Sequence, residues 1–243
     1  MKVLKFTLSG ETAFFKKPDV NSYCYFTYGN IHKVALLGMF GAILGYSGYN
    51  QMKKNDVYPE FYERLKSIRV SVSPNNEKGY TSKKVQIFNN SVGYASKEMG
   101  GNLIVKEQWL ENPSWDIYIV IENEEGEKIA DSLINNKVVY TPYLGKNDHF
   151  ANILNVKIFN NVSISDSCNK INSLCPKGYF TFCKDEWEEC EEETFKYEEK
   201  LPNKLDTNTN MYVLESFIYT NMDAEQCNEI EVFKIESKNI VFY

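Results

Sequence analysis

Segments in which apolar and polar residues alternate recur along the chain and predict β-strands, while longer apolar runs predict buried helices. The run at 34–46 is long enough for a helix, although Gly38, Gly41 and Gly45 each lower its helix propensity. These glycines fall on one helix face, so we expect another segment to approach that face closely. In chain order, the pattern predicts a strand at 2–8, helices at 34–46 and 60–66, strands at 68–72 and 115–121, a helix at 127–135, and strands at 138–140 and 156–159.

The order strand, helix, strand, strand, helix, strand is typical of a ferredoxin-like or RNA-recognition-motif domain. Residues 75–112 interrupt it, and their own alternating segments around 84–88 and 102–108 predict a projecting β-hairpin. We therefore predict the α+β class, with a ferredoxin-like (RRM-like) palm over residues 1–165 and an inserted β-hairpin thumb at about 75–112. Residues 166–243 are predicted to form an acidic, cysteine-bearing insertion and a small β-rich C-terminal lobe, with strand-like runs at 211–219, 230–235 and 240–243.

The charge of the chain is unevenly distributed. Its formal net charge is −6 over 243 residues, which alone argues against a nucleic-acid partner because Lys and Arg drive phosphate binding. Residues 1–110, however, carry 15 Lys and Arg against 8 Asp and Glu, and nine acidic residues fall within 185–199, opposed there only by Lys196. Such asymmetry points to a polyanionic partner for the basic half, with a solvated acidic face as the alternative.

The six cysteines are expected to be reduced thiols. The N-terminus lacks the pattern of a signal peptide, and the longest apolar run is too short to cross a bilayer, so we expect a cytoplasmic protein without a membrane partner. Cys168, Cys175, Cys183 and Cys190 recur at intervals of seven and eight residues, whereas structural zinc sites usually use pairs two to four residues apart. We therefore expect neither a metal nor a cofactor.

Two segments carry a resemblance to a known family. The opening, FTLSGETAFFKKPDVNSYCYFTYGNIHKVALLGMFGAILG, resembles the N-terminal signature of family 5 of the CRISPR-associated proteins, with a first strand, an Ala-Phe-x-x-Pro loop and a glycine-bearing helix. The signature positions are Ala13, Phe14, Lys17, Pro18, Tyr28, Gly38, Gly41 and Gly45. The segment TPYLGKNDHFANI at 141–153 resembles the Pro-Tyr-Leu-Gly-x-Asn-x-x-x-Ala motif of the type I-B branch. The resemblance covers residues 1 to about 165.

The resemblance implies a subunit of Cascade, the RNA-guided surveillance complex of prokaryotic antiviral defence. In the family, this subunit caps one end of the complex and holds the single-stranded 5′ handle of the guide RNA (crRNA). It contacts the adjacent filament backbone subunit and the large subunit, and it meets target DNA through the assembled complex. Sequence specificity toward the target then comes mainly from base pairing by the guide.

The basic half contains the groups that hold single-stranded RNA, namely cations for phosphates and aromatic rings for splayed bases. The candidate RNA-binding residues are Lys16, Lys17, Tyr28, His32 and Lys33 around the glycine-bearing helix, Lys78, Lys83, Lys84, Lys97, Lys106 and Trp109 in the hairpin, and Lys146 and Asn147 after Gly145. A solvated surface position remains the alternative for any single lysine, and a structural turn is the alternative for residues 145–147.

Two other functions are open. The type I-C branch of the family cuts repeat RNA with a metal-independent Tyr, Lys and His cluster. Here His32 or His149 could serve with Tyr28 or Tyr46 and with Lys33 or Lys146. The type I-B resemblance instead implies a separate ribonuclease, so we expect a chain without catalysis. A protein-interaction module built around the acidic segment 185–199 is the third hypothesis.

Overall fold

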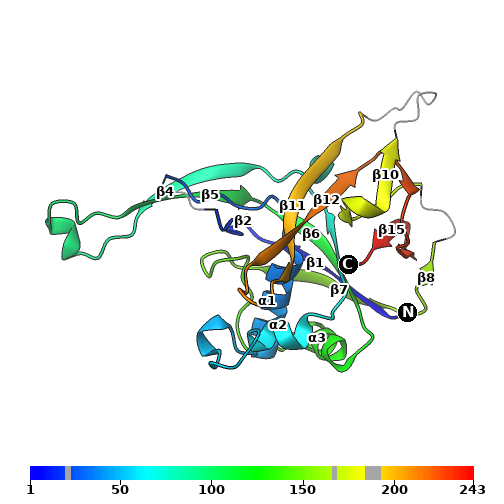
Figure 1. Cartoon of the computed structure of the whole chain (residues 1–243), viewed down its shortest axis with the longest axis horizontal. Coiled ribbons are helices and arrows are strands. Elements are labelled where there is room, and N and C mark those ends of the chain that lie inside the picture. Colours follow the sequence, from blue (N-terminus) through cyan, green and yellow to red (C-terminus); the bar gives the residue numbers. More distant parts are fainter. Residues whose placement is uncertain (20–22, 166–168, 184–192) are drawn as a thin grey trace.

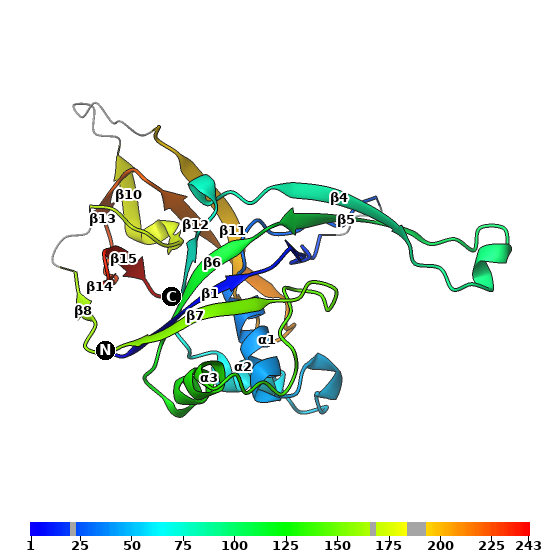
Figure 2. The ribbon, with the colours of Figure 1, turned by 180° about the vertical axis from the view of Figure 1, so that it is seen from behind.

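The computed structural model describes residues 1–19, 23–165, 169–183 and 193–243 (Figure 1). The chain is α+β, as predicted, and its main sheet has four strands in the order β3-β6-β1-β7 with every neighbouring pair antiparallel. These strands are β1 (Val3–Ser9), β3 (Val70–Pro74), β6 (Ser114–Val120) and β7 (Asn152–Phe159). The helices α1 (Lys33–Leu44), α2 (Glu60–Leu65) and α3 (Glu124–Ile134) lie on one side of this sheet (Figure 2).

Helix α1 is the apolar helix that the sequence predicts. His32 precedes it and accepts a hydrogen bond at Nδ1 from the Ala35 N–H, 3.2 Å away, which satisfies one free donor of the first turn. Gly45 ends the helix in the left-handed conformation, with φ of 79°. The expected close approach is confirmed at Gly41, because a Cβ there would overlap the Cβ of Phe61 in α2.

The opposite face of the main sheet is covered by the C-terminal end of the chain. Strand β14 (Val232–Ile235) pairs with β15 (Lys238–Val241) on one side and with β8 (Ser163–Ile164) on the other. Apolar side chains of β14 and β15, including Phe233 and Ile240, pack against Tyr118 of the main sheet. The Lys238 ammonium lies 3.2 Å from the Asp116 carboxylate across this contact. The part of this face around Tyr118 is therefore occupied by the protein itself, whereas Leu154 of β7 is 54% exposed.

A second C-terminal sheet packs beside α1. It consists of β11 (Lys196–Leu205), β12 (Tyr212–Thr220) and β9 (Cys175–Pro176). Strands β10 (Phe180–Cys183) and β13 (Asp223–Gln226) form a separate two-stranded sheet. Leu201, Leu205 and Phe217 of this sheet belong to the same hydrophobic core as α1 and β1. The C-terminal third thus shares its core with the N-terminal part.

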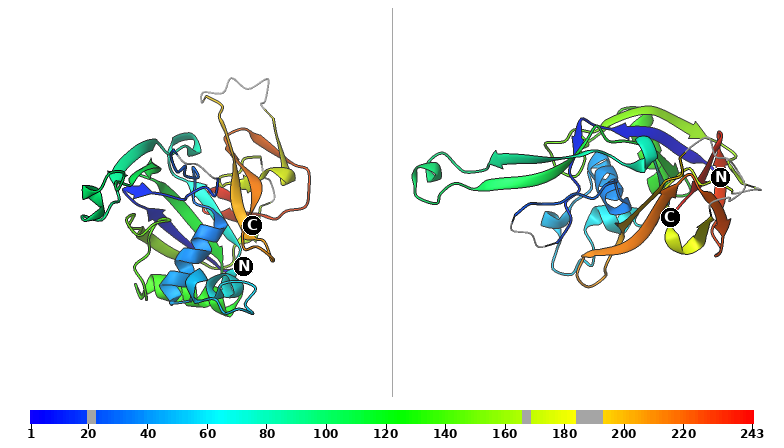
Figure 3. Two further views of the ribbon diagram at one scale, coloured as in Figure 1. Left: turned by 60° about the vertical axis from the view of Figure 1, so that its left-hand side comes forward. Right: turned by 90° about the horizontal axis from the view of Figure 1, so that it is seen from above.

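A long β-hairpin projects from the body between β3 and β6 (Figures 1 and 3). Its strands β4 (Lys83–Asn89) and β5 (Ile104–Glu111) pair over their whole length, and β2 (Thr12–Ala13) pairs with the base of β5. Tyr25 continues this edge, because its N–H donates to the Lys106 carbonyl and its carbonyl accepts from the Gln108 N–H, both at 2.9 Å. We call β4, β5 and the residues between them the arm.

Short 3-10 turns lie in the connections, at Tyr49–Gln51, Glu77–Gly79, Ala95–Lys97 and Lys177–Tyr179. The prediction of a strand at 138–140 is wrong. The Val139 N–H donates to the Ile43 carbonyl at 2.9 Å and the Tyr140 N–H to the Ala42 carbonyl at 3.3 Å. The N–H groups of this segment therefore bond to the free carbonyls at the end of α1, and they are not available for hydrogen bonds to a neighbouring strand.

Some sequence expectations fall on residues that lie outside the described part of the chain, namely Cys168, Cys190 and residues 185–192 of the acidic segment. Cys175 is a buried free thiol, and burial raises its pKa to about 12, whereas Cys183 is exposed. In the described ranges, no three His, Cys, Asp or Glu side chains gather in a way that could hold a metal ion. None of the described helices is long and apolar enough to cross a membrane.

Candidate nucleic-acid interface

At the root of the arm, two predicted RNA-binding lysines lie over aromatic rings. The Lys16 ammonium is 3.8 Å from the centre of the Tyr25 ring, and the Lys106 ammonium is 5.9 Å from that of Tyr23. Tyr23 is 81% exposed. We call Lys16 and Lys106 the ring-paired lysines. A cation beside an open ring offers both contacts that a single-stranded nucleotide needs, an ammonium for the phosphate and a face for the base.

Four other predicted lysines face carboxylates of the chain itself. The closest contacts are Lys17 to Glu199 at 3.2 Å, Lys78 to Glu193 at 2.6 Å, Lys84 to Glu111 at 3.4 Å and Lys146 to Asp148 at 3.2 Å. Two of them also lie near rings, Lys17 at 5.1 Å from the centre of Tyr28 and Lys146 at 5.0 Å from that of Phe88. We call these four the carboxylate-paired lysines, because each has a carboxylate partner. Because each charge is already offset, an RNA phosphate must compete with the protein's own carboxylate to use it.

The remaining lysines differ in their surroundings. Lys33 donates from Nζ to the Tyr243 carbonyl at 3.0 Å, and burial lowers its pKa to about 8. Burial also lowers the pKa of the half-buried Lys83. Lys97 is exposed in the turn at the tip of the arm. Of these three, only Lys97 stands fully in solvent, where it can meet a phosphate without first being uncovered.

Tyr28 and His32 lie inside the protein, with their rings 5.2 Å apart and edge to face. Because His32 accepts a hydrogen bond at Nδ1, its ring proton belongs on Nε2. Burial lowers the pKa of His32 to about 3 and raises that of Tyr28 above its ordinary value. At neutral pH both side chains are therefore uncharged, and His32 acts as the cap of α1.

The segment 141–153, which carries the second motif, lies against the N-terminal motif. The Phe14 N–H donates to the Leu144 carbonyl at 3.1 Å, and a Cβ at Gly145, whose φ is +87°, would overlap the Phe14 carbonyl. His149 is buried, with Nδ1 at 2.6 Å from Thr12 Oγ1 and its ring edge to face with Trp109 at 4.6 Å. Burial lowers the pKa of His149. Residues 141–150 thus fix the loop before α1 to the base of the arm.

Trp109 packs against this junction through His149, and Asn147 belongs to its loop. The Trp109 indole N–H donates to Glu107 Oε2 at 2.8 Å, and its ring packs 6.4 Å from that of Phe88 across the hairpin. Trp109 therefore helps to hold the arm at its root, while Asn147 is exposed on the loop surface beside Lys146. The structure thus brings Lys146, Asn147 and Trp109 together, and Lys16, Lys106 and Tyr25 on the neighbouring surface.

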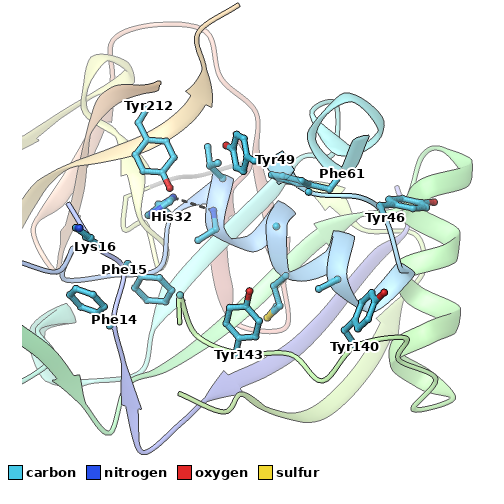
Figure 4. Close-up of a pocket in the computed structure, with 17 residues that line it drawn as sticks. Phe14, Phe15, Lys16, His32, Tyr46, Tyr49, Phe61, Tyr140, Tyr143 and Tyr212 are labelled. Carbon is cyan, nitrogen blue, oxygen red and sulfur yellow. Dashed lines mark hydrogen bonds between the residues drawn. The ribbon is translucent and has the colours of Figure 1, made fainter. Parts of the chain in front are cut away.

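Sequence reasoning missed a pocket of about 570 Å³ that runs along the exposed side of α1 (Figure 4). Aromatic side chains from separate parts of the chain surround it: Phe14, Phe15, His32, Tyr46, Tyr49, Phe61, Tyr140, Tyr143 and Tyr212. The only sequence signal is the count of 17 tyrosines and 15 phenylalanines, which does not show where they gather. Lys16 lines the same pocket, so the pocket adjoins the ring-paired lysines.

No protein-family model matches the chain, and no curated protein matches it. Among solved structures, it is similar to a chain of a "CRISPR RNA-guided surveillance complex", with a TM-score of 0.55, 14% identity and coverage of 92% of this chain and 91% of that one. It is also similar to a CRISPR protein from Archaeoglobus fulgidus, with a TM-score of 0.50, 10% identity and coverage of 99% and 98%. At these identities the likeness shows a shared fold, and the fold is one found among CRISPR-associated proteins.

Proposed function

We propose that this chain is a family 5 subunit of a type I-B CRISPR surveillance complex, without catalysis of its own, that binds and caps the 5′ handle of the crRNA. The topology supports a ferredoxin-like palm. With β1, β3, β6 and β7 as the four strands in chain order, the spatial order β7-β1-β6-β3 and antiparallel pairing are those of that fold. The arm between β3 and β6 then corresponds to the thumb, and the protein works in the prokaryotic cytoplasm.

The observation that carries the proposal is the pair of ring-paired lysines at the root of the arm. A cation–ring arrangement has no sequence preference of its own, because every base has a face that can stack. That suits a subunit that holds one invariant strand while the guide reads the target. The likeness of nearly the whole fold to a chain from an RNA-guided surveillance complex supports RNA as the polyanion.

The placement of the two histidines supports the absence of catalysis. A Tyr, Lys and His cluster needs the three side chains to converge on one substrate, but Lys33 points to the Tyr243 carbonyl while His32 caps α1. His149 is enclosed by Thr12 and Trp109. Clean cleavage of repeat RNA in chelator by the purified chain, abolished in His32→Ala or His149→Ala, would instead favour the endoribonuclease alternative.

The arm supports contact with the adjacent filament subunit. Val85, Ile87 and Ile104 share one face of the hairpin and are 54–59% exposed. Within the described residues, β4 pairs only with β5, so its outer edge offers free backbone groups. A two-stranded ribbon with apolar side chains on an open face gains stability when a partner covers it. The large subunit and, through the assembled complex, target DNA are the further partners proposed.

Fluorescence anisotropy with a labelled 5′-handle RNA, over a series of salt concentrations, tests the proposal. The double variant Lys16→Gln/Lys106→Gln is expected to bind about tenfold more weakly, and the slope of log affinity against log salt should fall by about 0.7 for each phosphate that no longer meets an ammonium. The matched double variant Lys78→Gln/Lys84→Gln has the same net charge as the first double variant, but it alters two carboxylate-paired lysines. Its affinity for the RNA should therefore fall less than that of Lys16→Gln/Lys106→Gln. An equal decrease in both pairs, or no binding by the wild-type chain, would contradict the proposal.

A further inference from the structure

The floor of the pocket along α1 includes three small residues beside Val34 and Met39. Ala35, Gly38 and Ala42 lie one turn apart on the same helix face and line it. Gly38 has room for a Cβ, since the nearest atom to a Cβ built there, Cε2 of Phe61, would lie in ordinary van der Waals contact at 3.9 Å. Gly41, by contrast, is filled by Phe61. The two glycines therefore have different roles, Gly41 in packing α2 and Gly38 in leaving space.

The walls of the pocket are held in place before any ligand arrives. The Tyr140 N–H is bonded to the Ala42 carbonyl, and the segment that follows is bonded to Phe14 through Leu144. On the other side, Tyr212 of β12 packs edge to face against His32 with ring centres 5.3 Å apart. Figure 4 shows Tyr143 and Tyr140 on one side of α1 and Tyr212 on the other. Rings fixed by the backbone bind a planar ligand with little loss of conformational entropy.

The charge of the lining favours an anion. None of the residues that line the pocket is Asp or Glu, although the chain as a whole has a net charge of −6. The one lysine is Lys16, which also lies over Tyr25 at the root of the arm. At the far end, the Tyr46 hydroxyl donates to Glu125 at 2.5 Å, and Glu125 itself does not line the pocket. A ligand with an anionic group at Lys16 and a flat ring over α1 fits this distribution.

We propose that this pocket receives an unstacked base of the bound single-stranded RNA, with its phosphate at Lys16. The inference rests on the proposed function and adds a second element to it. The ring-paired lysines hold the backbone at the root of the arm, and the pocket captures a base that turns out of the strand. An RNA strand held at both points keeps one fixed bend. A subunit that closes the end of a complex needs the RNA to hold such a fixed shape.

Filling the floor of the pocket tests the inference on the full chain. The variant Gly38→Leu places a side chain in the open space, and leucine is a good helix former. The probe is a labelled 5′-handle RNA, compared with the same oligonucleotide made abasic at every position. Gly38→Leu should weaken binding of the intact RNA about tenfold, within the range of one base–ring stack, and leave binding of the abasic RNA unchanged. The matched control Gly38→Ala should bind both as the wild type does.

A second pair of variants covers the case in which Gly38→Leu fails to fold. Tyr143→Ala removes a ring of the wall that is 43% exposed, whereas Tyr143→Phe keeps the ring. The alanine variant should bind the intact RNA more weakly and the phenylalanine variant should keep its affinity. Equal affinity in Gly38→Leu and Gly38→Ala, or equal weakening for intact and abasic RNA, would overturn the pocket inference. If the wild-type chain binds no handle RNA at all, the proposed function itself fails, so the two failures are distinguishable.

Discussion

The body and the arm of this molecule hold their shapes in different ways. In the body, Phe6, Phe40, Trp115 and Phe217 are at most 1% exposed and lie in one continuous core that reaches from β1 to the C-terminal sheet. In the arm, the apolar side chains of Val85, Ile87 and Ile104 on one face are more than half exposed. The body is thus stabilised by burial, whereas the arm keeps its form through strand pairing and through contacts at its root. Apolar surface left open in this way is surface available to a partner.

The lysines of the molecule are also paired in two ways. Lys17 and Lys78 face carboxylates from the C-terminal third, while Lys16 and Lys106 at the root of the arm face rings. A carboxylate offsets the charge of a lysine, whereas a ring leaves the net positive charge in place. The lysines that face rings therefore keep a net positive charge at the root of the arm.

The largest expected effect is in the body. Replacing Phe217 with Ala removes a ring that is 1% exposed and leaves a cavity between β12 and the core, so the free energy of unfolding should fall by about 3–5 kcal/mol in urea titrations. The matched variant Leu103→Ala in the arm, where the side chain is 56% exposed, should stay within about 0.5 kcal/mol of the wild type. Similar decreases in both variants would mean that the arm has a core of its own.

A smaller effect separates the two glycines of α1. Gly41→Ala places a Cβ on Phe61, so the helices must move apart and the free energy of unfolding should fall by about 1–3 kcal/mol, despite the better helix propensity of alanine. Gly38→Ala meets no such obstacle and should raise stability by up to about 1 kcal/mol. Thermal unfolding of the two variants side by side measures the difference, and equal midpoints would contradict this assignment.

The local pattern of the sequence predicts much of the fold but not the pairing of charges. Alternation identifies β1 and the arm, because successive side chains of these strands point to opposite faces that differ in burial. The spacing of the glycines predicts the close approach of another segment, which is Phe61. The partners of Lys17 and Lys78, in contrast, are Glu199 and Glu193, which only the folding of β11 onto the N-terminal part brings near. No local pattern contains that information.

The same limit explains the pocket and the missing strand. Tyr140 and Tyr212 line the same pocket only because Tyr140 is bonded to the end of α1 and β12 packs beside its start. The β-branched and aromatic residues at 138–140 have strand propensity, yet the free carbonyls of α1 take their N–H groups. Tertiary hydrogen bonds thus decide both features.

The buried histidine cap should make the stability of the body depend on pH. The pKa of His32 is about 3 in the folded protein against an ordinary value of 6.5, so below about pH 6.5 the unfolded chain binds the additional proton and stability falls. Between pH 7.5 and 5.5 the decrease should be roughly 1.4 kcal/mol, corresponding to one pH unit below the ordinary value. His32→Asn keeps a capping acceptor without titrating, so its urea-unfolding stability should change less over this interval. An equal pH dependence in both proteins would rule out His32 as the cause.

The smallest effect on the isolated chain is expected from the open face of the arm, and there the comparison with the body is most direct. The double variant Ile87→Ser/Ile104→Ser should change the free energy of unfolding by less than about 0.5 kcal/mol, because both side chains are already more than half exposed. If a neighbouring subunit covers this face, the same variant should assemble with the purified filament subunit less completely, as measured by size-exclusion chromatography. Val57→Ser, at a side chain that is 54% exposed in the body, is the matched control and should assemble normally. Unchanged assembly of the double variant would show that the apolar face of the arm is not an interface with that subunit.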